Sequence, residues 1–344
     1  MKPWFDIVTA VFPALCLGIL SSTLSSGAQH RDAGTEIFPF LNLNYDARTV
    51  AMAGAAVAMP NDCYGIFTNP AALGFINAPQ AIFGYRQVGA GIFSAPLAYA
   101  RPVPGRGTFA CGGVGLTGGV AVTDIGADGT EFEPGIKARS DNYSGNVSWA
   151  AKINDDVAAG VTVKGVYNYL SDGVDHWSAD GVIFDGGIQY RSSNSRLMYG
   201  FVVHNIGLLR SGFVDDDTYP LPAAVELGVS YVPRDISLLR LSLDLNKKIN
   251  DYLLFEPGFE LEIIERQLLI RGGYAVSWRD LQVFGSNLKG EQEENYFRTN
   301  RTTLCLGIGV ITELIDRTIK IDAGVEFSDA LAAPALVLSF LTDL

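Results

Sequence analysis

The stretch from Leu239 to Leu245 reads Leu-Arg-Leu-Ser-Leu-Asp-Leu, so a leucine stands at every odd position and a polar residue at each even position between them. Successive side chains of a β-strand point to opposite faces, so this stretch predicts a strand with one apolar and one ionic face. Residues 255–263 and 319–327 alternate in the same way. A soluble sheet can contain one such strand. A chain built of them, with charges on the enclosed face, is typical of a barrel with lipid outside and water inside.

The composition agrees with a membrane barrel. The chain has 344 residues, of which 48% are hydrophobic and 18% are charged, whereas about 25% charged residues is usual in soluble proteins. It contains 38 glycines, 14 tyrosines and 19 phenylalanines, and aromatic residues form girdles at both membrane interfaces of such barrels. The net charge of −12 argues against nucleic acid as a partner, because nucleic-acid binding requires a basic surface.

The N-terminus has the parts of a secretory signal peptide. Lys2 supplies the charge, residues 7–20 the apolar stretch, and Ser26-Gly27-Ala28 the small residues before cleavage, which we place after Ala28. An uncleaved anchor is the alternative, but Pro13 and the short apolar run disfavour it, because a spanning helix needs about 20 apolar residues. No later segment reads as a membrane helix, so we expect the bacterial outer membrane as the location.

From residue 79 onward the sequence predicts an all-β fold: a transmembrane antiparallel β-barrel of about 14 strands, with a small N-terminal hatch inside the lumen. Every second connection is short. Outer-membrane barrels have short periplasmic turns and longer external loops, so this parity predicts that both termini are periplasmic. The expected divisions are a signal peptide (1–28), a leader and hatch (29–78) and the barrel (79–344). The expected strands are 79–88, 91–103, 107–123, 141–153, 156–171, 178–192, 196–208, 221–233, 237–248, 252–265, 267–284, 301–313, 317–328 and 334–342.

Residues 37–76 differ from everything that follows, because they are rich in alanine and their apolar residues do not alternate. Within them, Asn69 suits a helix N-cap, Pro70 the first helical position, and Gly74 the end of a turn. A compact helical turn by itself explains these three residues. The small residues between Ala51 and Ala58 allow backbones to approach closely, so we expect a separate element inside or beneath the barrel.

The combination of Ala47-Arg48, Met52 to Ala55, Asp62 and Asn69 to Leu73 resembles the N-terminal hatch signature of FadL-like outer-membrane proteins. That group includes the long-chain fatty acid transporter and the PorV/PorQ-type proteins of type IX secretion. The compact length, together with Asn205-Ile206-Gly207, is more similar to the PorV/PorQ type. Ala53 departs from the pattern, where a second glycine is common. The resemblance implies that the hatch plugs the lumen, and it assigns the motif to Arg48, Met52, Gly54, Asp62, Asn69, Pro70 and Ala71.

The third expected strand is rich in glycine. In the fatty acid transporter of this group, a kink in the third strand opens the wall sideways, so the resemblance implies a lateral opening here. Glycine within a strand marks a bulge or the close approach of another backbone. Close packing of the hatch against this strand explains the same residues equally well. The candidates for a lateral opening are Gly112, Gly113, Gly115, Gly118 and Gly119.

Charged residues of both signs occupy the lumen-facing positions of neighbouring strands. Because buried charges need partners, we expect cross-strand pairs that fill the interior and hold the hatch. An open, ion-selective pore is the alternative. The candidates are Arg240, Asp244, Glu260, Arg271, Lys320, Asp322 and Glu326.

The sequence carries no signature of an enzyme. His30, His176 and His204 are isolated, and neither a Gly-x-Ser-x-Gly motif nor a phosphate-binding loop occurs. We therefore predict a non-enzymatic protein with no cofactor and no metal. The expected partners are outer-membrane lipid and either a hydrophobic small molecule, if the protein is a transporter, or secretion-system proteins, if it is an envelope-assembly component.

Overall fold

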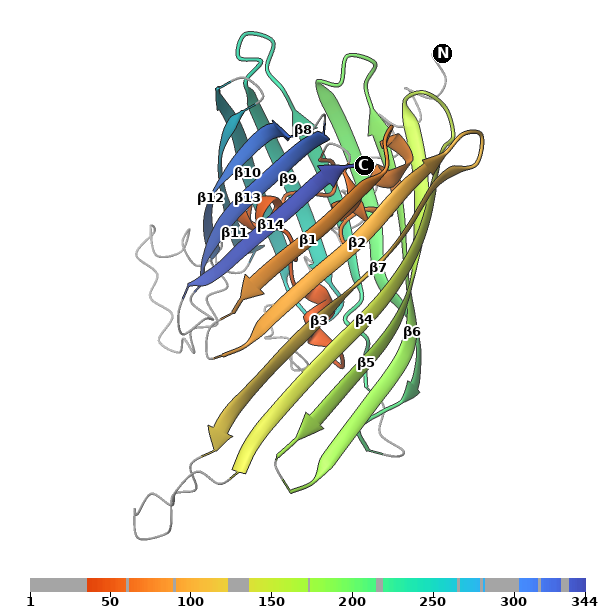
Figure 1. Ribbon diagram of the computed structural model, residues 1–344, viewed down its shortest axis with the longest axis vertical. Coiled ribbons are helices and arrows are strands. Elements are labelled where there is room, and N and C mark those ends of the chain that lie inside the picture. Colours follow the sequence, from red (N-terminus) through yellow and green to blue (C-terminus); the bar gives the residue numbers. More distant parts are fainter. Residues whose placement is uncertain are drawn as a thin grey trace.

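The computed structural model describes residues 36–59, 62–88, 91–122, 136–172, 174–214, 219–264, 267–278, 281, 303–314, 317–328 and 334–344. In this part of the chain, fourteen strands form one closed barrel (Figure 1). Each strand pairs antiparallel with its neighbours in sequence, and the first pairs with the last. Closure leaves no free sheet edge, which is the condition for crossing a bilayer with strands. The expected fold class is confirmed.

The strands lie close to the expected ranges. The largest difference is that the strand expected at 267–284 ends at Ser277, where the chain turns helical at Trp278 and the Trp278 ring packs 5.7 Å from that of Phe255. The bounds are β1 (Gln80–Gln87), β2 (Phe93–Val103), β3 (Gly107–Val122), β4 (Ile136–Lys152), β5 (Val157–Ser171), β6 (His176–Arg191), β7 (Leu197–Ser211), β8 (Ala224–Tyr231), β9 (Leu239–Lys248), β10 (Leu253–Ile264), β11 (Leu268–Ser277), β12 (Thr303–Leu314), β13 (Arg317–Ser328) and β14 (Ala335–Asp343).

The barrel wall has two heights. Strands β3 to β7 contain 15 to 17 residues, whereas about 9–11 residues suffice to cross a bilayer. The other strands contain 8 to 12 residues. In Figure 1 the long strands extend well below the rest, on the rim where β3 and β4 are joined. The start of β1 and the end of β14 lie at the opposite rim, where Gln80 pairs with Asp343.

The alternation of the sequence sorts the side chains between the two faces of the wall. On β9, Leu241 and Leu243 are 44% and 40% exposed on the outer face, whereas Ser242 and Asp244 are buried on the lumen face. Large apolar side chains are exposed in the same way on strands around the barrel. No helix among the described residues is long and apolar enough to cross a bilayer. The outer surface is therefore an apolar band suited to lipid.

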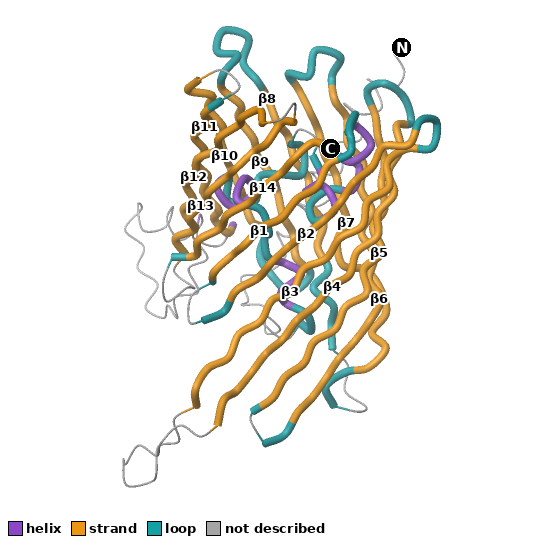
Figure 2. Tube along the Cα trace, viewed as in Figure 1, coloured by secondary structure: helices purple, strands orange, loops and turns teal. Residues whose placement is uncertain are grey.

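Residues 37–59 and 62–76 lie inside the barrel and contain short helical turns (Figure 2). We call this segment the hatch. Its elements are η1 (Pro39–Asn42), α2 (Ala47–Ala51), η2 (Cys63–Ile66) and η3 (Pro70–Phe75). α2 lies against β11 to β14, and η3 lies against β3 to β6, so the hatch bridges opposite sides of the lumen. The expected signal peptide and leader, residues 1–35, lie outside the described residues.

Candidate functional site

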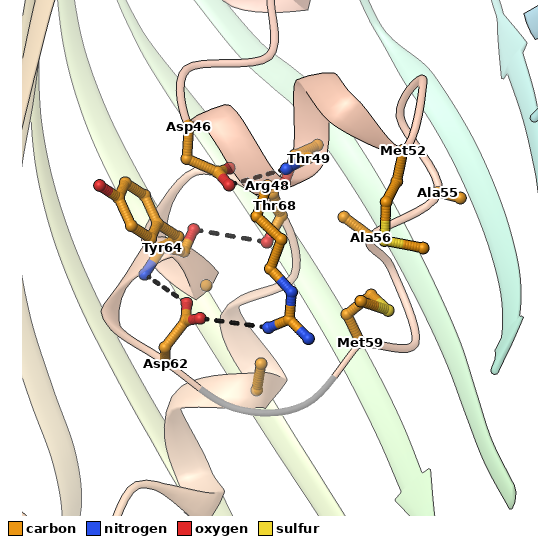
Figure 3. Close-up of a pocket in the computed structure, with 12 residues that line it drawn as sticks. Asp46, Arg48, Thr49, Met52, Ala55, Ala56, Met59, Asp62, Tyr64 and Thr68 are labelled. Carbon is orange, nitrogen blue, oxygen red and sulfur yellow. Dashed lines mark hydrogen bonds and ion pairs between the residues drawn. The ribbon is translucent and has the colours of Figure 1, made fainter. Parts of the chain in front are cut away.

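The hatch motif begins with a capped helical turn. Asp46 is extended and its Oδ1 accepts a hydrogen bond of 2.8 Å from the backbone N–H of Thr49, so it forms the N-cap of α2 (Figure 3). An N-cap carboxylate satisfies an amide that has no partner within the helix. Burial raises the pKa of Asp46 to about 6, against the opposing effect of the Thr49 hydrogen bonds. The cap sets the direction in which Arg48, two residues later, leaves the helix.

Arg48 joins the hatch to the wall. Its Nε and Nη2 each donate at 3.0 Å to a carboxylate oxygen of Glu260 on β10, and its Nη1 lies 3.5 Å from Oδ2 of Asp62 in the hatch (Figure 3). Glu260 also accepts from Nε of Arg271 on β11 at 2.7 Å, and Nη1 of Arg271 donates to Asp322 on β13 at 2.5 Å. Two-pronged arginine–carboxylate pairs combine strength with a fixed geometry. The motif arginine thus enters a four-residue ionic chain across three strands.

Asp244 makes a second attachment, to the backbone of the hatch. Its Oδ2 accepts from the N–H groups of Ala56 and Val57, each at 2.8 Å. A third attachment runs through Arg86 on β1, which donates to the carbonyl of Asn44 and lies 2.7 Å from Glu326 on β13. Each of these three attachments joins a charged residue of the wall to the hatch.

The two remaining candidate charges lie at the margin of this network. Arg240 donates to Oγ of Ser230 at 3.1 Å, and its Nε is 3.9 Å from Glu260. Lys320 is half-buried and shares a face of β13 with Asp322. Within the described part of the chain, neither residue forms a hydrogen bond or ion pair with the hatch, and both lie near the short-turn rim of the lumen.

The Asn69-Pro70-Ala71 segment docks on glycines of the long strands. Asn69 caps η3 by accepting from the N–H of Ala71 at 3.1 Å, and its Nδ2 donates to the carbonyl of Val57 at 2.9 Å. A Cβ atom added to Gly187 on β6 would lie 2.1 Å from Oδ1 of Asn69, and one added to Gly160 on β5 would lie 2.5 Å from Pro70. The motif therefore fits a surface from which side chains are missing.

The motif residues Met52 and Gly54 make equally close contacts on the other side of the lumen. A Cβ atom at Gly273 on β11 would lie 2.2 Å from the backbone of Met52. Gly54 has a φ of 101°, and a Cβ atom there would lie 2.8 Å from the carboxylate of Glu256 on β10. The backbone conformation of Gly54 therefore favours glycine, and the Glu256 carboxylate packs against it.

The glycine-rich strand β3 forms regular ladders with both of its neighbours. β3 pairs without a register shift with β2 from Val103 to Phe93 and with β4 along its whole length. Gly112 and Gly113 are tightly packed, since added Cβ atoms would lie 2.5 Å from Cβ of Ala98 and 2.4 Å from the carbonyl oxygen of Ser144. The expected bulge is therefore not present at these residues, and the close approach of neighbouring strands accounts for them. Gly115, Gly118 and Gly119 continue the same regular ladder with β4.

The wall is irregular at β7 instead. The β6–β7 ladder shifts register between Phe184 and Gly186, and Asn205 on β7 adopts a left-handed φ of 57°. Pairing of β7 with β8 ends at His204, opposite Ala224, although β7 continues to Ser211. This irregularity was not predicted from the sequence. The Asn-Ile-Gly at residues 205–207 could have indicated it, because asparagine tolerates the left-handed conformation.

A buried polar cluster accompanies this bulge. Lys164 lies 2.7 Å from Asp185 and donates to Oδ1 of Asn205 at 2.8 Å. His204 Nδ1 is 3.2 Å from Asp185, and its Nε2 is 4.0 Å from Glu226. His204, expected to be isolated, is therefore part of an ionic group. In the described part of the chain, no group of three or more His, Cys, Asp or Glu residues is arranged to hold a metal ion.

An apolar and a polar surface meet where the hatch faces the rim with the long loops. One is apolar: Ile37, Phe38 and Phe40 of the hatch pack with the lumen-facing Val166 of β5 and Ile183 of β6. The other is a polar cavity of about 90 Å³ between the hatch and β7 to β10. A further pocket of about 20 Å³ lies within the hatch around Arg48, with Met52 and Met59 beside it (Figure 3).

No protein-family model matches the sequence, and no curated protein matches it. Solved structures do match. The toluene transporter TodX of P. putida has a TM-score of 0.64 at 13% identity, over 88% of this chain and 99% of that chain. The CymD monoaromatic hydrocarbon channel has a TM-score of 0.61 at 11% identity, over 87% and 97%. A Pseudomonas aeruginosa FadL homologue has a TM-score of 0.54 at 14% identity, over 87% and 97%. At these identities the likeness establishes a shared fold and no more, that of the closed antiparallel barrel.

Proposed function

We propose that this protein is a FadL-like outer-membrane barrel that passes a hydrophobic molecule across the outer membrane and catalyses no reaction. The observation that carries the proposal is an apolar inner surface on β3, β5 and β6, against which the N-terminal part of the hatch packs. Val114 of β3, Val166 of β5 and Ile183 of β6 are buried on the lumen side. A water-filled porin has a polar interior, whereas a surface of this kind suits an apolar ligand. The similar solved structures are named as toluene transporters and hydrocarbon channels.

The hatch obstructs the passage of a molecule straight along the barrel axis. A molecule that enters at the long-loop rim meets a segment held by Glu260, Asp244 and Arg86. We therefore place the exit in the wall, as the glycine motif suggested, but at β7 rather than at the glycines of β3. There, among the described residues, the ladder of β7 with β8 ends at His204, and the apolar Leu209 and Phe213 pack against the apolar cluster of the lumen.

The proposed function also implies a location in the outer membrane and the removal of a signal peptide. The apolar outer band calls for outer-membrane lipid, and export to that membrane calls for a signal peptide, for which residues 1–28 remain our prediction. With the signal peptide removed, both ends of the barrel lie at the rim with short turns, which we assign to the periplasm.

Uptake of toluene by cells that express the protein tests the proposal. We expect faster uptake than in cells with an empty vector, and a several-fold loss in a Val166→Asn variant, which places a polar group of similar size on the apolar lumen surface. Lys320→Gln, in the ionic half of the lumen, is the matched control and should keep uptake. Equal uptake in cells with and without the protein, at normal barrel assembly, would contradict transport.

The alternative is a PorV/PorQ-like component of a secretion or envelope-assembly system. Its support is the motif from Ala47 to Gly74 and the Asn205-Ile206-Gly207 segment. This function needs partner proteins and no apolar cargo. Absence of uptake together with stable co-purification of envelope proteins after cross-linking in cells would favour it over transport.

A further inference from the structure

The outer face of the barrel carries an unpaired positive charge near the short turn that joins β2 to β3. Arg101 is exposed and lies on the same face of β2 as the outward-facing Leu97 and Tyr99. In the half of the wall near the short turns, it is the only charged residue that faces outward on the described parts of β1 to β5. Its guanidinium forms no hydrogen bond or ion pair with another described residue. A charge on a lipid-facing surface costs free energy unless it reaches the interface or finds a partner.

A second arginine lies close to the first in the sheet. Arg106 is exposed in the turn between β2 and β3, and its carbonyl accepts a hydrogen bond of 2.9 Å from Nε1 of Trp149 on β4. Across the sheet, Arg101 stands opposite Phe109, and Phe109 stands opposite Trp149. The two arginines therefore border one pair of aromatic residues, Phe109 and Trp149, which are 48% and 45% exposed.

No carboxylate of the described residues neutralises these two cations. The next turn at the same rim carries Asp155 and Asp156, and neither forms an ion pair with Arg101 or Arg106. The carboxylate of Leu344, beside the start of β1, likewise forms none with them. The two guanidinium groups are therefore free to bind an anion from the surroundings of the barrel.

Apolar residues continue this surface toward the middle of the wall. One row further from the turn, Tyr99, Val147 and Val163 face outward and are exposed. On a membrane barrel such a surface contacts acyl chains, and an aromatic ring with a polar edge, such as that of Trp149, lies at headgroup level. A guanidinium binds a phosphate through two parallel hydrogen bonds. Cations at the turn and apolar residues behind them match a lipid, with its phosphate at the arginines and its chains on the apolar row.

We propose that Arg101 and Arg106 bind the headgroup of an anionic phospholipid in the periplasmic leaflet, with its acyl chains over Phe109, Trp149 and Val147. This inference rests on the outer-membrane location in the proposed function, and it adds the class of lipid and its place on the wall. Two cations without a described counter-charge favour a headgroup with a net negative charge over a zwitterionic one, whose own cation offsets the phosphate. An acidic protein segment would pair with the arginines but would leave the apolar row uncovered.

Quenching of tryptophan fluorescence by brominated lipids tests the proposal. The full-length protein is reconstituted into phosphatidylcholine vesicles in which a fraction of the lipid is dibrominated phosphatidylglycerol or, for comparison, dibrominated phosphatidylcholine. The emission that disappears in a Trp149→Phe variant reports this surface. We expect phosphatidylglycerol to bind there about threefold more tightly than phosphatidylcholine, which is the scale of an exposed ion pair.

Arginine variants identify the source of that preference. Arg101→Gln and Arg106→Gln should each reduce the ratio of the two binding constants, and the double variant should bring it to about one, because it removes both ion pairs. Arg234→Gln is the matched control, since it changes an exposed arginine in the turn between β8 and β9 at the same rim. It should leave the ratio unchanged.

Three results would overturn the proposal. The first is equal binding of the two lipids by the wild type, and the second is a preference that survives in the double variant. The third is a preference that inorganic phosphate abolishes at constant ionic strength, because the surface would then bind a free anion. Equal lipid binding together with cross-linking of residue 101 to an acidic protein in cells would assign the surface to a protein partner.

Toluene uptake is a separate measurement, so the two proposals can fail independently. Loss of the lipid preference with normal uptake would overturn only the lipid surface. Absence of uptake with an intact lipid preference would contradict transport and leave the lipid surface in place.

Discussion

The two sides of this barrel hold the same hatch by different means. Strands β9 to β13 are short and present charges: Glu260 and Arg271 form an ionic chain with Arg48, and Asp244 separately accepts from the backbone of the hatch. Strands β3 to β6 are long and present glycines and apolar residues, against which Asn69-Pro70 and Phe38 pack. The first side therefore adds ionic pairing to close packing on glycines, whereas the second holds the hatch mainly by close packing, with a hydrogen bond from Gln189 to the carbonyl of Met59.

This difference separates attachment from passage. Removing one residue of a buried ion pair costs free energy, because its partner remains as an unpaired buried charge. Apolar contacts between a short segment and a smooth wall have no such directional requirement. A ligand can therefore compete for the apolar side while the ionic side keeps the hatch in place.

The largest effect should come from breaking the ionic side. Glu260→Ala leaves Arg48 and Arg271 without their shared carboxylate, and removing one partner of a buried ion pair costs about 3–5 kcal/mol. We expect a hatch that is cleaved rapidly by protease and a barrel that leaks small solutes, measured by limited proteolysis and liposome swelling. The exposed Glu313→Ala variant is the control. An intact, non-leaking hatch in the Glu260 variant would show that shape alone retains it.

A smaller effect should follow from a change on the outer face of the same side. Leu243 is exposed on β9, where the structure presents lipid-facing leucines. Leu243→Arg should cost about 2–4 kcal/mol at mid-membrane depth, measured by urea unfolding in lipid vesicles. Leu243→Phe keeps the site apolar and should unfold like the wild type. Ser242 is not a suitable control, because its hydroxyl lies 3.2 Å from Sδ of Met59 in the hatch. Equal unfolding free energies for the two Leu243 variants would contradict the assigned face.

The smallest effect tests the side held by shape. Gly187→Ala places a Cβ atom 2.1 Å from Oδ1 of Asn69, whereas Gly186→Ala meets nothing within 4 Å. Overpacking costs about 1–3 kcal/mol, so the first variant should loosen η3 and the second should not. Hydrogen exchange of the Ala71 amide, which donates to Asn69, reports the difference. Identical exchange in both variants would show that Asn69 does not depend on the bare surface of β6.

Much of this architecture follows from local sequence. Alternation is a property of neighbouring residues and predicts the strands, their faces and their order, since each strand pairs with the next. The hatch was predictable as a separate element from its alanine content and the Asn69-Pro70 cap, because capping is also local. The strand expected at 267–284 was too long because the change to helix at Trp278 accompanies a contact with Phe255, a residue of another strand.

By itself, then, the sequence determined that this chain forms a β-barrel with an apolar outer face and an internal segment, because period-two patterning and helix caps act over a few residues. The tertiary structure decided which charge meets which, as in the chain from Arg48 through Glu260 and Arg271 to Asp322. It also showed that the glycines of β3 pack closely instead of forming a bulge, and that the wall is irregular at Asn205. These facts depend on strand register and on which side chains face one another across the lumen, and no local pattern specifies either.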